Sequence, residues 1–430
     1  KWSFLPPPDG KQRFLAVNAD ESEPGTFKDR MIIDFDPHMM LEGMAICMFA
    51  CNLDTAYINT IGAAVLTNSL GHTIRGTGRI YGTLLNEGLV SADQPGTTLQ
   101  LLSAAKTNNR DITAVGTSNL SISGITGVPV WGTTANFLQN GRSLLLGSTI
   151  ATGVVTWSDS FSLGAGNRTV NVANNTLTTA DRAALSGVIS GTGAFVKTGR
   201  GVLDLTGNNT FTGQVQIRAG EIAVSSVTNS MIAGALGAGS SIAMGSRTGS
   251  GVLRYLGGAG STDRAFQLAG STGGATIAAD GVGPLVLSGG VSGTVAGNKT
   301  LTLTGTSTGA NEVAGVISNG TGALAVAKSG VGRWILSNAN SYTGTTTVSG
   351  GGLLRVNGIN TGVSLTAINA GGSLGGTGTL PGAVTLAAAA GASINLVDGS
   401  AGTLTLNGAT TSLTLGGTAA LPNSLYFDLG

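Results

Sequence analysis

Residues 197–213 read KTGRGVLDLTGNNTFTG, and residues 328–344 read KSGVGRWILSNANSYTG. The two stretches align without a gap, and 14 positions separate the lysine from the aromatic residue in both. Short runs that alternate apolar and polar residues between glycines and asparagines predict strands joined by tight turns. Because one supersecondary unit recurs, its copies are expected to stack on one another. The repeat therefore predicts a β-solenoid in which the two copies occupy equivalent rungs of one ladder.

The sequence around the two copies repeats as well, since GVIS occurs at 187–190 and again at 315–318. Strand-like runs follow one another at roughly eight to ten residues with no helical stretch between them, a spacing typical of a sandwich, a barrel or a stacked β-helix. The repeat favours the last of these. The clearest runs are GVLDL at 201–205, VQI at 215–217, EIAV at 221–224, WIL at 334–336 and LLRV at 353–356.

The expected fold class is therefore mainly β, an elongated parallel β-helix, with right-handed coiling as the default. Valine, leucine and isoleucine are expected inside, threonine, serine and asparagine outside, and glycine or asparagine at the corners. Trp334, which aligns with Leu203, is expected to fill the stack. Phe211 and Tyr342, which align with each other, are expected in the core and in register along the solenoid.

The same residues resemble the autotransporter-associated β-strand repeat, over roughly residues 150–410. GGSLGGTGTL at 371–380 and AGTLTL at 401–406 are similar to the closing coils of that family. The resemblance implies a structural or adhesive passenger that is secreted or displayed on a bacterial outer surface. We expect repeats over 151–430, preceded by degenerate coils over 59–150.

The composition argues against several classes of function. The 430 residues include 71 glycines, with 10% charged and 5% aromatic residues, which is unlike an ordinary enzyme. A net charge of +1 gives no footprint for binding nucleic acid. No apolar stretch reaches the roughly 18 residues that a membrane span needs. Expected partners are a surface glycan or a host or matrix protein, and a bare strand edge at the end of a solenoid predicts end-to-end self-association.

The first 58 residues differ sharply from the rest, because they hold both cysteines and five of the seven methionines but only three glycines. RFLAVN at 13–18 predicts a buried strand, and DESEPG at 20–25 predicts an acidic turn. Asp36 and Pro37 then provide an N-cap and a first-turn proline for an amphipathic helix. The pattern predicts a small α/β fragment, and an acidic loop at a strand end is a common ligand site.

KWSF at 1–4, NADESEPGT at 18–26, KDR at 28–30 and DPH at 36–38 resemble the flavin subunit of respiratory complex I and its formate dehydrogenase and hydrogenase relatives. That resemblance implies contacts to FMN and NADH, since amide and carboxylate groups suit ribityl hydroxyls and a lysine suits phosphate. The implied contact residues are Lys1, Asn18, Asp20, Glu21, Ser22 and Glu23.

The family's glycine-rich phosphate loop and its cluster-binding cysteines have no counterpart around this segment. A fragment of 58 residues also buries too little surface to fold reliably alone. We therefore expect residues 1–58 to be a non-functional remnant that binds neither FMN nor NADH, with a chimeric join near Ile58 and Asn59. An NADH:acceptor oxidoreductase fragment is the alternative function.

No metal or catalytic site is expected. Cys47 and Cys51 share one helix face, and His38 alone cannot complete a tetrahedral metal site, so buried helix cysteines are expected. A polysaccharide-acting β-helix enzyme is a third interpretation. Its candidate acids would be Asp204, Glu221 and Asp263, which are isolated in the sequence.

Overall fold

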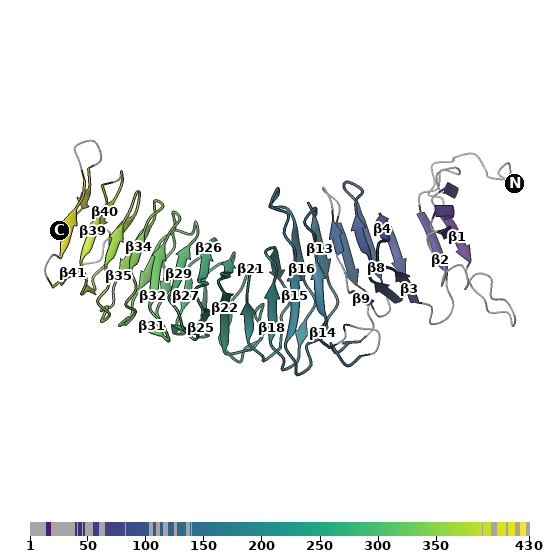
Figure 1. Ribbon diagram of the computed structural model, residues 1–430, viewed down its shortest axis with the longest axis horizontal. Coiled ribbons are helices and arrows are strands. Elements are labelled where there is room, and N and C mark those ends of the chain that lie inside the picture. Colours follow the sequence, from purple (N-terminus) through teal and green to yellow (C-terminus); the bar gives the residue numbers. More distant parts are fainter. Residues whose placement is uncertain are drawn as a thin grey trace. The chain divides into compact units, whose positions relative to one another are not determined.

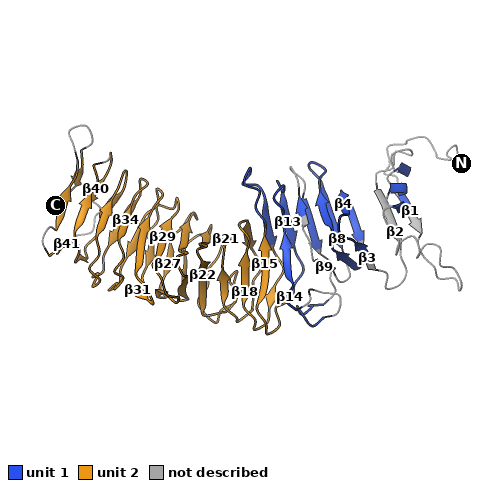
Figure 2. Ribbon diagram, viewed as in Figure 1, with its two compact units in different colours: residues 1–161, 173–184 blue, residues 162–172, 185–430 orange. Residues whose placement is uncertain are grey.

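The computed structural model describes residues 14–18, 39–40, 42–44, 46–47, 55–59, 65–81, 83–102, 106–108, 112–114, 119–123, 127–134, 138, 140–388, 390–396, 402–409, 412–417 and 422–426. The chain divides into two compact units (Figure 2). Unit 1 comprises residues 1–161 and 173–184, and unit 2 comprises residues 162–172 and 185–430. Strands dominate both units. Among the described residues, helix occurs only within 39–47.

Unit 1 begins with a strand, a helical segment and a second strand. β1 (Phe14–Asn18) pairs in parallel with β2 (Thr55–Asn59), and helical residues lie between them in the chain. Met44 is buried on the helical segment, whereas Met39 and Ile46 are exposed. The predicted strand and helix are thus found in the residues described, and β2 adds a parallel partner.

The rest of unit 1 is coiled. Strands β3, β4 and β5 make one turn, and the strands three positions later pair with them in parallel. Trp131, Trp157 and Phe161 form an aromatic cluster, with ring centroids of Phe161 6.1 Å from Trp131 and 6.3 Å from Trp157. The strands are β3 (Val65–Asn68), β4 (Thr73–Gly76), β5 (Gly78–Tyr81), β6 (Thr83–Asn86), β7 (Leu89–Ala92), β8 (Thr98–Leu102), β9 (Lys106–Asn108), β10 (Ile112–Ala114), β11 (Asn119–Ser123), β12 (Ser143–Leu146) and β13 (Val154–Trp157).

Unit 2 is a parallel β-solenoid whose coils stack in sequence (Figure 1). Three parallel sheets form its faces, named here A, B and C. Sheet A comprises β19 (Val202–Leu205), β21 (Gly220–Val224), β23 (Gly251–Tyr255), β26 (Ala275–Ala279), β29 (Lys299–Thr304), β32 (Leu324–Lys328), β34 (Thr346–Val348), β36 (Thr366–Ile368), β39 (Val384–Leu386) and β42 (Leu413–Leu415).

Sheet B comprises β15 (Arg168–Val172), β18 (Phe195–Thr198), β20 (Val215–Ile217), β22 (Ser241–Arg247), β25 (Ala265–Gly270), β28 (Val291–Gly293) and β31 (Ile317–Gly320). Sheet C comprises β24 (Gly260–Thr262), β27 (Leu285–Leu287), β30 (Asn311–Val313), β33 (Trp334–Leu336), β35 (Leu353–Val356), β37 (Ser373–Gly375), β40 (Ser393–Asn395) and β43 (Ser424–Tyr426). β16 (Arg182–Leu185) belongs to sheet A, and the two-residue strands β14 (Phe161–Ser162), β17 (Ile189–Ser190), β38 (Thr379–Leu380) and β41 (Thr405–Leu406) complete the chain.

The alternation in the sequence explains why these strands form a solenoid. Inward residues on sheet A stack rung by rung, for example Leu203 on Ile222 and Leu253 on Ile277. All four side chains are buried, so each rung removes apolar surface from water. The predicted mainly-β, parallel solenoid is confirmed, and so are the five strand-like runs quoted from the sequence.

The two copies of the repeat do not occupy equivalent rungs of one ladder, so that prediction is wrong. Lys197 lies in β18 of sheet B, whereas Lys328 lies in β32 of sheet A. Leu203 is likewise in sheet A and Trp334 in sheet C. The second copy therefore lies on different sheets from the first. This is possible because the strands of every sheet need the same alternation of apolar and polar residues and the same turn residues. The length of the intervening chain then decides which face receives the motif.

The aromatic residues of the repeat are in the core, as predicted, but their contacts differ. Trp334, Phe211 and Tyr342 are all buried. Phe211 stacks on Phe195, with ring centroids 5.8 Å apart. Tyr342 instead shares a hydrogen bond with Thr346 through its hydroxyl, at 2.7 Å.

Buried asparagines hold the corners of successive coils together. Asn209 Oδ1 accepts a hydrogen bond from Ile189 N at 2.8 Å, and its Nδ2 donates to Ala235 O at 2.7 Å. One amide thereby satisfies backbone groups of the coils before and after it. Asn340 Oδ1 accepts from Ile317 N in the same way, at 2.9 Å.

Replacing Asn209 with alanine is expected to destabilise unit 2 by about 2–4 kcal/mol, because it leaves a buried N–H and a buried C=O without partners. Urea unfolding measures the loss, and hydrogen exchange at the Ile189 amide locates it. Asn208→Ala is the matched control, since Asn208 is exposed. Equal midpoints for the two variants would contradict the bridging role of Asn209.

Candidate functional sites

The residues implied as flavin and nucleotide contacts lie almost entirely outside the described part of the chain. Lys1, Asp20, Glu21, Ser22 and Glu23 are not among the described residues, and neither are Cys51 and His38. Asn18 is the last residue of β1, and its backbone is in register with Asn59 of β2. The carboxyl end of a parallel strand is where open α/β sheets hold nucleotides. The described residues thus provide a strand end of the right kind at Asn18 but no assembled cradle, and no catalytic step through FMN or NADH follows from them.

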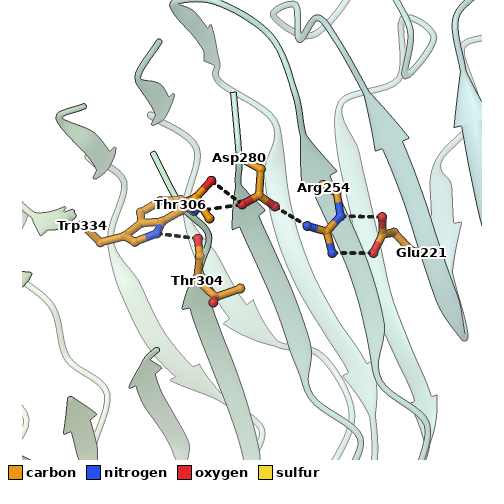
Figure 3. Close-up of polar contacts among 6 residues, drawn as sticks. All are labelled: Glu221, Arg254, Asp280, Thr304, Thr306 and Trp334. Atoms are coloured by element: carbon orange, nitrogen blue, oxygen red, sulfur yellow. Dashed lines mark hydrogen bonds and ion pairs between the residues drawn. The ribbon is translucent and has the colours of Figure 1, made fainter. Parts of the chain in front are cut away.

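An ion-pair ladder crosses the outer face of sheet A (Figure 3). Arg254 on β23 donates from Nε to Glu221 Oε1 at 2.6 Å and from Nη2 to Glu221 Oε2 at 3.0 Å. Its Nη1 binds Asp280, just after β26. One guanidinium therefore joins acids from the coils on both sides, in the bidentate geometry that favours arginine over lysine.

The ladder continues beyond Asp280. Its Oδ1 accepts from Thr306 N at 2.8 Å and from Thr306 Oγ1 at 3.0 Å. These bonds fasten consecutive coils along the outer face of unit 2. Inside the solenoid, the buried Trp334 donates from Nε1 to Thr304 O at 3.0 Å (Figure 3).

Of the candidate acids, which are isolated in the sequence, Glu221 is brought by the fold to Arg254 although 33 residues separate them. Asp263 lies elsewhere, where its Oδ1 accepts from Ser230 N at 2.6 Å, and this hydrogen bond lowers the pKa of Asp263. Asp204 lies on β19. A glycosidase needs one protonated and one ionised carboxyl group facing a substrate. Glu221 and Asp280 both face one guanidinium instead, so the ladder is built for cohesion.

Arg254→Gln is expected to lower the stability of unit 2 by about 1 kcal/mol at low salt, because the ladder is partly exposed to water and salt screens it. Thermal unfolding at low and high ionic strength measures the effect, which should shrink as salt rises. Arg75→Gln, which removes the exposed ion pair with Asp93, is a control for unit 1. A loss that is independent of salt would refute the electrostatic origin.

Buried lysines are a feature that the sequence pattern did not reveal. Lys197 and Lys328 both point inward and have no exposed surface. Lys197 Nζ donates to Thr198 O at 2.8 Å, Gly199 O at 2.9 Å and Ala219 O at 3.3 Å. Lys328 Nζ donates to Ser329 O at 2.9 Å and Gly330 O at 2.8 Å. Each ammonium thus closes the turn that follows its own strand.

A glycine accompanies each of these lysines. A Cβ added at Gly220, which has φ +68°, would lie 2.8 Å from Lys197 Nζ, and one at Gly352 would lie 2.2 Å from Lys328 Nζ. The turn clamp therefore consists of a lysine and a glycine more than twenty residues later. The signal in the sequence was the alternation itself, since Lys197 and Lys328 occupy inward positions of FVK and LAVAK.

Burial shapes the titration of both lysines. Desolvation lowers the pKa of Lys197 to about 7, against a smaller opposing effect of Glu221. Desolvation lowers the pKa of Lys328 to about 8. The lysine clamps therefore titrate close to neutral pH rather than far above it.

The described residues hold neither a metal-binding cluster nor a membrane-spanning helix. Within the described ranges, no three His, Cys, Asp or Glu side chains gather closely enough to hold a metal ion. Cys47 is a free, half-buried cysteine on the helical segment. Across the same ranges, no helix has the length and apolarity to cross a bilayer.

Comparison with known proteins separates the chain into two parts. Residues 1–65 match the Nuo51 FMN-binding domain. Among curated proteins, this part is 51% identical over 65 residues to the second F subunit of NADH-quinone oxidoreductase from Rhizobium meliloti (strain 1021), a match that covers 15% of each chain. It is 53% identical over 66 residues to the NADH-quinone oxidoreductase F subunit of Rhodobacter capsulatus, again covering 15% of each. The chain thus spans about 15% of the length of these relatives.

The second part matches a different family. Residues 195–224 and 326–354 match the passenger-associated-transport-repeat. Both stretches lie in unit 2, and each contains one lysine clamp. No solved structure matches the chain. The chain therefore joins a segment similar to the flavin-binding part of complex I to a β-solenoid that carries autotransporter passenger repeats.

Proposed function

We propose that unit 2 is a non-catalytic passenger, secreted or displayed on a bacterial surface, with a structural or adhesive role. The observation that carries this proposal is the position of the two passenger-repeat matches within one continuous stack of parallel coils. Such a stack offers a long, regular outer surface built from nearest-neighbour contacts. A surface glycan or a host or matrix protein is the partner that this role implies.

The outer surface supports a role without catalysis. The acids that the fold brings together, Glu221 and Asp280, are both engaged by Arg254. The buried lysines are engaged by turn carbonyls and have no access to solvent. These carboxylates, this guanidinium and these ammonium groups therefore hold coils and turns of unit 2 together.

Surface display and adhesion test the proposal together. The full chain fused to an outer-membrane translocator should be cleaved by protease on intact cells, and such cells should adhere to a panel of immobilised glycans and matrix proteins. The glycans of this panel should show no new reducing ends after contact with the cells. Release of sugar, or a chain that protease cannot reach on intact cells, would overturn the proposal. Adhesion no better than that of cells carrying the translocator alone would exclude the adhesive role.

End-to-end self-association is a further part of this proposal. Leu415 on β42 and Leu425 and Tyr426 on β43 are exposed. Exposed apolar side chains on short strands of a solenoid attract another apolar strand. Sedimentation velocity over a range of concentrations should reveal growing species, and a single monomeric boundary throughout would refute it.

We further propose that residues 1–58 are a non-functional remnant. The alternative, an NADH:acceptor oxidoreductase fragment, draws on the identity of this part to NADH-quinone oxidoreductase chains. Incubation of the purified chain with FMN is expected to leave flavin fluorescence unquenched, in the chain and in its Asp20→Ala variant alike. Quenching that Asp20→Ala abolishes would favour the alternative.

Amplification of the source DNA across the codons for residues 50–70 tests the join, and a clean single product would show that both parts are encoded together.

A further inference from the structure

A long loop of unit 2 exposes two large apolar side chains at its tip. Residues 225–240 join β21 to β22 and contain no charged residue. Met231 is 88% exposed and Ile232 is 55% exposed. Met231 also has a φ of 67°, one of two positive values at non-glycine residues in the described part of the chain. This backbone conformation is strained for methionine, and glycine would adopt it at lower cost.

The tip, residues 228–232, is named here the knob, and a buried arginine from the next coil holds it. Arg264 has no exposed surface and donates from Nη2 to Gly237 O at 2.6 Å and from Nη1 to Leu236 O at 3.1 Å. Its Nε donates to Thr228 O at 3.1 Å. Further bonds from Nη2 reach the carbonyls of Asn229 at 3.3 Å and Ile232 at 3.4 Å. The loop therefore closes around one guanidinium, which makes the knob rigid.

Three N–H groups of the knob are also paired inside the protein. Ser230 N donates to Asp263 Oδ1 at 2.6 Å, Met231 N donates to Ala238 O at 2.9 Å, and Ile232 N donates to Asn229 O at 3.2 Å. Backbone groups that are already paired can leave water without the penalty of an unsatisfied donor or acceptor. The knob thus presents two apolar side chains on a backbone that is partly paired inside the protein, while the carbonyls of Ser230 and Met231 stay open to water.

We propose that the knob inserts Met231 and Ile232 into the surface of a lipid bilayer. The proposal goes beyond the passenger role and does not depend on it. An uncharged loop that exposes two apolar side chains at its tip suits the interface of a bilayer, where backbone carbonyls still reach water. Asp263, whose pKa is lowered by the bond from Ser230, stays charged at the base of the knob. Because no cation lies in the loop, zwitterionic lipid is favoured over anionic lipid.

Insertion of two side chains is weaker than anchoring by a single acyl chain, which is itself reversible. One copy should therefore bind transiently, whereas many copies on one surface should bind stably by avidity. The attachment is thus a property of chains arrayed side by side.

Vesicle capture by beads densely coated with the full chain tests the insertion. Phosphatidylcholine vesicles should bind, and adding phosphatidylserine should not strengthen binding. The double substitution Met231→Ser and Ile232→Ser should lower capture on the order of tenfold or more, because both apolar side chains are lost. Leu177→Ser, at a residue 92% exposed in unit 1, is the matched control and should capture as the parent chain does.

Met231→Gly separates insertion from folding. It relieves the strained backbone, so its melting temperature should equal or exceed that of the parent chain while vesicle capture falls. The proposal is overturned if phosphatidylcholine vesicles are not captured, if the double variant captures them equally well, or if the knob supports adhesion to protein-coated surfaces but not to lipid. Adhesion to glycans or matrix proteins without vesicle capture would overturn the insertion and leave the passenger role intact.

Discussion

Raising the pH from 7 towards 10 should stabilise unit 2, contrary to the usual behaviour of proteins in alkali. Lys197 and Lys328 are buried, and desolvation lowers their pKa values to about 7 and about 8, from 10.5 in an exposed lysine. Between these values and 10.5 the unfolded chain binds the protons that the folded chain has lost. Stability rises with pH wherever the unfolded state binds more protons.

The stabilisation has a defined window and size. Below pH 7 both states are protonated at Lys197, so its pH dependence vanishes. Above that, each site adds at most about 1.4 kcal/mol per pH unit, which amounts to a few kcal/mol over the window. Burial raises the pKa of Tyr255 and Tyr342, so their ionisation in the unfolded chain reverses the trend at still higher pH. Urea unfolding monitored from pH 7 to about pH 9.5 measures the gain.

Lys197→Met identifies the group responsible. The variant should lose one site's share of the pH dependence, while Arg200→Met, at an exposed position in the same turn, should keep all of it. At high pH the neutral amine of Lys197 still donates to turn carbonyls, so the methionine variant should be less stable than the parent chain by about 1–3 kcal/mol. A parent chain whose stability falls steadily from pH 7 upward would refute the lysine-clamp account.

The fold could be read from the sequence because its information is local and repeated. Alternation in GVLDL and WIL fixes which side chains point inward, and the recurrence of the lysine-to-aromatic motif requires stacking. The face on which each copy lies could not be predicted, because Lys197 and Lys328 satisfy the same local rules on sheets B and A. That choice depends on loop lengths such as residues 225–240, which carry no periodic signal.

Long-range polar contacts were beyond the sequence for a similar reason. Glu221 and Arg254 are 33 residues apart, and Arg264 bonds to carbonyls 27 to 36 residues before it. In a solenoid the sequence separation of such pairs equals the length of one or more coils. Because coil length varies along this chain, the pairs cannot be located from the sequence. The residues implied as FMN and NADH contacts were recognised by sequence similarity alone. Apart from Asn18, their positions in the structure stay a prediction.

Arg264→Met should produce the largest loss of stability of any single substitution considered for unit 2, about 3–5 kcal/mol, because it leaves several buried carbonyls without a donor. The guanidinium reaches the carbonyls of Thr228, Leu236 and Gly237 at once, and no aliphatic side chain can replace those bonds. Urea unfolding measures the loss, and hydrogen exchange should show residues 226–238 opening ahead of the β-strands around them.

Two further variants separate the fork geometry of Arg264 from its charge. Arg264→Lys keeps the charge but cannot reach all the carbonyls together, so it should recover only part of the lost stability. Arg218→Met removes an exposed arginine that bonds to Gln216 at 2.9 Å, and it should cost no more than about 0.5 kcal/mol. Arg264→Met could instead unfold at the same urea concentration as Arg218→Met, with unchanged hydrogen exchange at residues 226–238. The loop would then not depend on the buried guanidinium, and Arg264 would not make the knob rigid.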